Sequence, residues 1–252
     1  MRRLGILATG LLAAILAAGP AAADPRLRIT TEHSPPAAMM ANGQLVGFAT
    51  DKVREILRRT GTAYEIVLLP WKRAYLMAQN EPNTCVYSTT RTPEREALFK
   101  WVGPTHDNDW TLFALSERHY KFKTLADVGQ LRIGTYNGDV RGDALQAQGF
   151  NVDAVQSQSS NPRKLLLGRI DLWATSLRVG NATVVLNGWQ SKIEPVLTWR
   201  HTQMYLACHR SVPDSLVARM NSALEAMKQD GTAHAIDKKY ELWQDPLATA
   251  SR

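Results

Sequence analysis

Apolar residues along this chain form short runs that alternate with amphipathic stretches. Short runs bounded by turn residues are typical of strands, whereas apolar residues three or four positions apart are typical of helices. The spacing of Val53, Ile56 and Leu57 predicts one helix, which Thr50 would cap and Gly61 would end. The strands predicted in this first part are 27–31, 64–69 and 84–88, and a second helix is predicted over 71–79.

The same alternation continues after residue 130. Its last helix opens near Pro213 and carries Leu216, Met220, Ala223 and Met227 along one face. The other predicted elements are strands 131–136, 152–156, 170–174 and 206–208, with helices over 143–148 and from residue 160 to Gly168. Strands that alternate with helices predict an α/β chain with parallel sheets, whose ligands bind at the carboxyl ends of the strands.

The first 23 residues have the pattern of a secretory signal peptide. Arg2 and Arg3 precede an apolar run over 4–18, and three alanines precede Asp24. No lipobox cysteine follows, so we expect the mature chain to be free in the periplasm. Removal of this segment would leave 229 residues and, with two arginines lost, would lower the net charge from +7 to +5.

The charge and the motifs exclude several classes of protein. The modest positive excess is scattered, with no block of lysine or arginine, so nucleic acid is not an expected partner and a small anionic molecule is. Cys85 and Cys208 have no zinc-ligand spacing, and in an oxidising compartment either a disulfide or two buried thiols is possible. No P-loop, no GxGxxG and no nucleophile–His–Asp pattern occurs, so no cofactor, metal or catalytic residue is predicted.

A helix start in the middle of the first half carries an unexpected charge. Thr92 and Pro93 suit the beginning of a helix, and the acids Glu94 and Glu96 suit its positive end. Arg95 adds a cation to the same turn. We interpret this arginine as the ligand of an anion, because a guanidinium pairs with a carboxylate through two parallel hydrogen bonds.

Four segments give the chain a resemblance to a known family. They are "GQLVGFATDKVREILRRTG", "TRTPEREALFKWVGP", "LLLGRIDLW" and "LVARMNSALEAMKQDGTAHAIDKKY". In order and spacing they resemble the amino-acid-type periplasmic solute-binding proteins of ABC importers. The resemblance implies the type II fold, with two α/β lobes of mostly parallel sheet joined by two hinge strands and closing on a ligand. It implies lobe one over 24–108 and 203–252, and lobe two over 109–202.

The resemblance also implies ligand contacts on lobe one. Arg95 matches the family's carboxylate-binding arginine, and Ser88 and Thr90 match neighbouring hydrogen-bonding positions. Arg91 has no such match, so a structural or rim role is predicted for it. Trp71 matches an apolar or aromatic wall.

Two further contacts are predicted on lobe one. Arg73 would be a second contact for the anion, and Glu32 matches a position that is often acidic or polar in the family.

Lobe two departs from the family pattern. Members that bind α-amino acids usually place an aspartate five residues after the aspartate of the "GRxD" signature; here Asp171 is the signature residue and Ser176 stands at the counted position. Asp139 is the alternative acceptor for an α-ammonium group. Otherwise the ligand has no α-amine.

The function implied is capture of a small polar, carboxylate-bearing solute, an amino acid or organic acid, by a monomer that delivers it to the membrane permease of an ABC importer. The same topology pairs the strands that carry Cys85 and Cys208, which implies a disulfide. Two alternatives stay open. One is an enzyme of the same fold, resembling cyclohexadienyl dehydratase, with Glu32 as general acid; the other is a periplasmic sensor or partner protein that feeds no transporter.

Overall fold

A computed structural model of the chain describes residues 24–241. The predicted signal peptide, 1–23, lies outside the described residues. No helix in the described part is long and apolar enough to span a membrane. The strands are β1 (Leu27–Thr31), β2 (Met39–Ala41), β3 (Gln44–Val46), β4 (Tyr64–Leu68), β5 (Thr84–Thr90), β6 (Lys100–Leu115), β7 (Ile133–Tyr136), β8 (Val152–Val155), β9 (Leu172–Ser176) and β10 (Ile193–Cys208).

Eight of these strands form one sheet, in the order β4-β1-β5-β10-β6-β9-β7-β8. At one end β1 pairs in parallel with β4 and β5, and at the other end β7 pairs in parallel with β8 and β9. Between them β6 and β10 run antiparallel to each other, and each also pairs antiparallel with one of the two outer groups. The two parallel groups are therefore joined through the two long strands.

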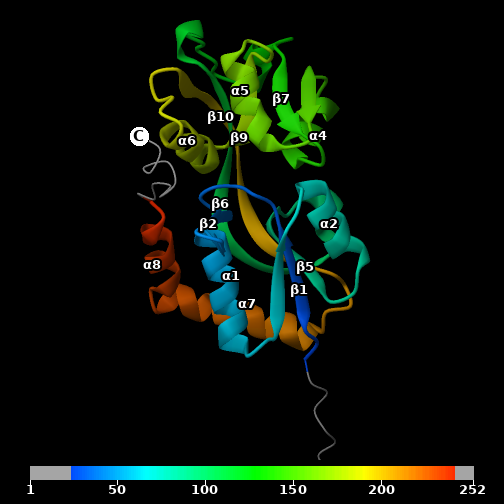
Figure 1. Cartoon of the computed structure of the whole chain (residues 1–252). Helices are drawn as coiled ribbons and strands as arrows, with labels where there is room; N and C mark the ends of the chain where they lie inside the picture. The colour runs from blue at the N-terminus through cyan, green and yellow to red at the C-terminus, as the bar shows by residue number, and fades with distance from the viewer. Residues whose placement is uncertain (1–23, 242–252) are drawn as a thin grey trace, which may run out of the picture.

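Figure 1 shows the result as two lobes, with β6 and β10 passing from one to the other. Helices α1, α2, α7 and α8 lie around the first group of strands, and α4, α5 and α6 around the second (Figure 1). The two-lobed α/β fold expected from the sequence is confirmed. The helices are α1 (Phe48–Thr60), α2 (Trp71–Asn80), α3 (Pro93–Glu96), α4 (Val140–Ala147), α5 (Asn161–Leu166), α6 (Leu177–Leu186), α7 (Asp214–Gln229) and α8 (Thr232–Lys239), with 3-10 turns at Ser116–Arg118, Leu125–Val128 and Gln158–Ser160.

Some predicted boundaries were wrong. Helix α1 begins at Phe48 after Gly47, so Thr50 is inside the helix and is not its cap. Its hydroxyl instead lies 2.7 Å from the hydroxyl of Tyr87 in the core. Helix α4 begins at Val140, three residues before the predicted start, because Asp139 caps it by accepting from the amide of Arg141. The β2–β3 hairpin, strand β6 and helices α6 and α8 were not predicted from the local pattern, and only 206–208 of β10 was.

The core of lobe one combines the two ends of the chain. Leu27 and Ile29 of β1 pack in one cluster with Leu216 and Met220 of α7, and all four side chains are fully buried. A disulfide joins Cys85 of β5 to Cys208 of β10, so the predicted bond is confirmed. The end of β10 and helix α7 are therefore integral parts of lobe one.

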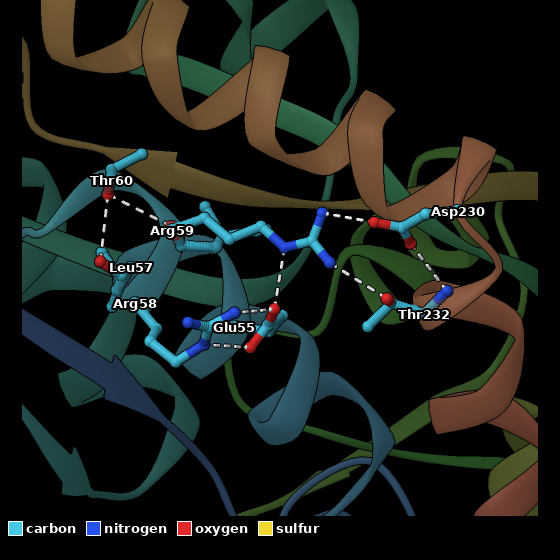
Figure 2. A network of polar contacts seen from close by, with 8 residues as sticks. Glu55, Leu57, Arg58, Arg59, Thr60, Asp230 and Thr232 are labelled. Carbon is cyan, nitrogen blue, oxygen red and sulfur yellow. Dashed lines mark hydrogen bonds and ion pairs between the residues drawn. The ribbon is translucent and has the colours of Figure 1, made fainter.

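A polar network fixes α1 to the corner between α7 and α8 (Figure 2). Arg59 of α1 donates to Glu55 in its own helix and to Asp230 and Thr232 at the corner, with distances of 2.7, 2.7 and 3.0 Å. Arg58 also donates to Glu55, and the two guanidinium groups lower the pKa of that carboxyl to about 2. The network orders the helices on the outer side of lobe one, away from the strand ends.

Candidate functional site

Two neighbouring spaces lie where the lobes meet. One is a cavity of about 270 Å³ whose lining includes Glu32 and Ser88 from lobe one and Ser176 from lobe two. The other is a groove of about 1140 Å³ that contains Arg95. Asp107 and Asp109 of β6 line both spaces, so the two lie next to each other along this strand.

Glu32 follows the carboxyl end of β1 and reaches across to lobe two. Its Oε1 accepts a 2.7 Å hydrogen bond from the hydroxyl of Tyr136, at the end of β7. Burial raises the pKa of Glu32 to about 8, with a further increase from Asp139 and opposing contributions from the Tyr136 hydrogen bond and from Arg141. The carboxyl is therefore mostly protonated at neutral pH.

Asp139 and Arg141 form a buried ion pair at the start of α4. Nε of Arg141 lies 3.0 and 3.1 Å from the two carboxylate oxygens, and the side chains are 2% and 7% exposed. Asp139 also caps α4 and lines neither space. A carboxylate that already has these partners is poorly placed to accept an ammonium group from a ligand.

Arg95 lies in the short helix α3 that follows β5. Its guanidinium carbon is 4.8 Å from the ring centroid of Tyr75, and the side chain is buried. Nη1 is enclosed but has no hydrogen-bond partner among the described residues. A buried, charged donor without a partner is costly, so this group is suited to an anionic oxygen.

Ser88 and Thr90 lie at the end of β5. Ser88 has a positive φ of 59°, and its hydroxyl, which has no partner in the described part of the chain, borders the smaller cavity. Thr90 borders the groove, and its hydroxyl lies 3.4 Å from Sδ of Met204. The predicted lobe-one contacts are thus divided between the cavity and the groove.

Ser176 ends β9 and caps α6, where its hydroxyl accepts from the amide of Val179 at 3.3 Å. Two positions later Arg178 crosses to lobe one. Its guanidinium carbon lies 3.6 Å from the ring centroid of Phe48, and it donates to Oδ1 of Asp237 in α8 at 3.3 Å.

Asp237 holds a second cation. Its Oδ2 accepts at 2.7 Å from the buried Lys52, which also donates to the carbonyl of Thr105 at 2.9 Å. One carboxylate therefore connects both lobes near the cavity.

The structure does not bring Trp71 and Arg73 to either space. Trp71 is buried, and its Nε1 donates to the carbonyl of Gly138 on lobe two at 2.8 Å. Arg73 is exposed and borders a separate hollow of about 540 Å³ between α2 and lobe two. Arg91, for which a structural or rim role was predicted, pairs with Glu96 at 2.5 Å and is 40% exposed.

Four cleft residues were not found from the sequence: His106, Tyr136, Arg141 and Arg178. Tyr136 ends a predicted strand, and the strand-end rule could have identified it. His106 lies on β6, where the sequence predicted no strand. Burial, followed by the nearby Lys52 and Arg178, lowers its pKa to about 3, so His106 is neutral.

Comparisons with known proteins agree with this architecture. The family model for bacterial extracellular solute-binding proteins, family 3, matches residues 27–242. ABC transporter arginine-binding protein 1 of Escherichia coli (strain K12) is 27% identical over 252 residues, covering 91% of this chain and 97% of that protein. An ancestral arginine-binding protein bound to glutamine is 25% identical, with a TM-score of 0.76 over 86% of this chain and 97% of that one. A histidine kinase sensor domain shares the fold at 16% identity, with a TM-score of 0.78 over 88% of this chain and 99% of its own. The chain belongs to the bacterial extracellular solute-binding proteins, family 3.

Proposed function

We propose that this protein captures a small, carboxylate-bearing solute between its lobes in the periplasm and delivers it to the permease of an ABC importer. The proposal assigns 24–108 and 203–252 to lobe one, 109–202 to lobe two, and 1–23 to export. It takes the protein to act as a monomeric carrier and not as a catalyst.

The proposal rests on the burial of Arg95 and on the lack of a hydrogen-bond partner for its Nη1 in the described part of the chain. This cation is buried beside Tyr75 at the wall of the groove, and one of its nitrogens has no partner among the described residues. A carboxylate would satisfy it with two charge-assisted hydrogen bonds. Closure of the lobes would then exclude water and strengthen the pair.

The relatives support the solute class and the transport role. The Escherichia coli relative is an arginine-binding protein of an ABC transporter, and the ancestral relative was solved with glutamine bound. Both of those ligands carry a carboxylate. The cross-lobe contacts of Tyr136 with Glu32 and of Trp71 with Gly138 are those of a cleft that can close.

A thermal-shift screen of the mature protein tests this proposal, with amino acids, organic acids and polyamines as probes, followed by calorimetry on the hits. We expect carboxylates to stabilise the protein, because a ligand that binds only the native state raises its stability. Small-angle scattering should show a smaller radius of gyration with ligand than without it, since closure requires preferential binding to the closed form. Stabilisation by polyamines alone would contradict the role of Arg95. An unchanged radius of gyration at saturation would contradict capture by closure.

One observation favours a second candidate function, a lyase of the same fold. The carboxyl of Glu32 lines the smaller cavity with a pKa of about 8, so it could donate a proton at neutral pH as a general acid. Incubation of the protein with each screening hit, followed by mass spectrometry of the solution, tests this candidate. Recovery of the unchanged solute supports the carrier, and loss of water or carbon dioxide from it supports the lyase.

A further inference from the structure

The lobe-two wall of the smaller cavity includes the hydroxyl of Thr175, to which no role has been assigned. Thr175, the fourth residue of β9, is 1% exposed and lines this cavity. Its Oγ1 is enclosed and makes no hydrogen bond to any described residue. Buried hydroxyls normally have a partner, so this one indicates a group that enters the cavity.

The N-terminus of α6 faces the same cavity. Leu177, Arg178 and Val179 all border it, and α6 has ten residues with no acid in its first turn. The hydroxyl of Ser176 satisfies only the amide of Val179. The first amides of a helix have no acceptor within the helix, and together with the helix dipole they favour a negative group.

Nearby cations add to this positive end. Arg178 borders the cavity, and its hydrogen bonds to Asp237 are long, at 3.3 and 3.4 Å. His106 also borders the cavity, and Arg178 and Lys52 contribute, after burial, to lowering its pKa. Both effects indicate a positive potential where the lobes meet.

No acid of β9 or α6 offsets this potential within the cavity. Apart from Asp109 of β6, the lobe-two residues that line it include no aspartate or glutamate. Glu32, on the opposite wall, is mostly protonated at neutral pH. The remaining acids of the lining are Asp107 and Asp109 of β6, which border the groove as well as the cavity. Asp109 is 2.7 Å from Nδ1 of His201, and Asp107 accepts from Gln203 at 3.2 Å.

We infer that Thr175 and the N-terminus of α6 form a second anion subsite, so that the solute is a small dicarboxylic acid without an ammonium group. The inference rests on the proposed function, in which Arg95 holds the first carboxylate. The cavity and the groove share Asp107 and Asp109, so one molecule could occupy both. An α-ammonium at the α6 end of the cavity would be buried beside a helix N-terminus, with no acid of β9 or α6 to accept from it, which is costly.

Calorimetry with matched solutes tests the inference. Succinate and aspartate differ only in the amine, and so do glutarate and glutamate; arginine and butyrate complete the panel. We expect at least one diacid to bind ten-fold or more tightly than its amino counterpart and than butyrate. Tighter binding of aspartate, glutamate or arginine than of succinate and glutarate, the two diacids without an amine, would overturn the inference but leave the proposed function intact. Binding of no carboxylate would overturn both.

Two substitutions of Ser176 test the effect of a negative charge at the start of α6. Asparagine and aspartate are both good helix caps of nearly equal size, so both variants should keep α6. We expect Ser176→Asp to bind the diacid at least 30-fold more weakly than Ser176→Asn, because the two variants differ only in the charge at this position. Equal affinities of the two variants would contradict an anion at this position.

A third substitution examines the hydroxyl of Thr175. Thr175→Val keeps the shape of the side chain and should weaken diacid binding about ten-fold. Thr60→Val, at the end of α1 and far from the cleft, is the matched control and should leave the affinity unchanged. An unchanged affinity for Thr175→Val would remove this residue from the subsite.

Discussion

The hydroxyl of Tyr136 and the carboxyl of Glu32 meet across the two lobes at 2.7 Å, while the same hydroxyl accepts a longer hydrogen bond, 3.4 Å, from Nη2 of Arg141 on its own lobe. The contact places a mostly protonated acid at the boundary between the lobes.

Glu32→Gln should flatten the pH dependence of stability. The native pKa of Glu32 is about 8 and its ordinary value is 4.5, so the native state holds a proton that the unfolded state releases between these values. The free energy of unfolding should therefore fall as the pH rises from about 4.5 to 8, by at most about 1.4 kcal/mol per pH unit from this group. Urea unfolding at pH 5, 6, 7 and 8 measures the slope.

The control for this experiment is Glu117→Gln. Glu117 is exposed, so its loss should leave the slope of the native protein unchanged. The same slope in Glu32→Gln as in the native protein would show that Glu32 titrates near its ordinary pKa.

Arg95→Ala should weaken solute binding by about 30-fold to several thousand-fold. Truncation of one partner of a shielded charge pair costs roughly 2–5 kcal/mol, much of it from the partner left unpaired. Arg95→Lys should restore affinity only in part, because lysine keeps the charge and loses the fork. Calorimetry with the solute found in the screen measures all three proteins.

Arg91→Ala is the matched control for Arg95. Arg91 is exposed and paired with Glu96, so its loss should change affinity by less than about ten-fold, or about 1.4 kcal/mol. If Arg91→Ala abolishes binding and Arg95→Ala does not, the site must be centred on Arg91 instead.

Loss of the disulfide should destabilise lobe one. Cys85 and Cys208 are separated by 123 positions, and the chain-entropy model gives about 4–5 kcal/mol for a loop of this length. We expect the double variant Cys85→Ala, Cys208→Ala to lose a free energy of this order in urea unfolding. Alkylation without reductant, followed by mass measurement, should find no free thiol in the native protein. Two labelled thiols would contradict the bond.

Asp237→Asn and Arg178→Gln should have different effects on stability. Asp237→Asn leaves Lys52 buried without its carboxylate, which we expect to cost about 3 kcal/mol. Arg178→Gln removes only a partly exposed ion pair between the lobes, so the free energy of unfolding should fall by no more than about 1 kcal/mol. Urea unfolding of the two variants tests whether Asp237→Asn is the more destabilising. A larger loss for Arg178→Gln would mean that the cross-lobe contact of Arg178 is the stronger one.

The sequence predicted the parts of the fold that have strong local signals. Strand β1 was identified to the residue, β5 to within two residues, and the end of α1 at Gly61 was correct. Strand β6 was missed because its central part, with Asp107 to Asp109, is polar and resembles a loop. It is a strand because β10 pairs with it along nearly its whole length, which is information that no local pattern contains.

Helix α6 was missed for a related reason. Gly180 and β-branched residues at Thr183 and Val184 lower its helix propensity. The structure requires the glycine, because a Cβ at this position would lie 2.2 Å from the ring of Phe113 on β6. Tertiary packing therefore overrides propensity here.

The sequence was less informative about the cleft. Glu32 and Ser88 were identified through the family resemblance, and Arg95 through both the resemblance and the charge pattern of the helix start at Thr92. The pairing of Asp139 with Arg141 depends on where α4 begins, and that start was misplaced by three residues. The positions of Trp71 and Arg73 depend on the contact between α2 and lobe two, which no local pattern specifies.

The return of the chain to lobe one through β10 has a consequence for the order of folding. The strands and helices of lobe two are contiguous, so they can assemble as soon as they emerge. Lobe one lacks its β10 strand, the partner of its cysteine and the α7 side of its core until the last fifty residues are present. If the chain is exported from its N-terminus, as proposed, lobe two would therefore fold before lobe one, and lobe one would be completed only when translocation is nearly finished.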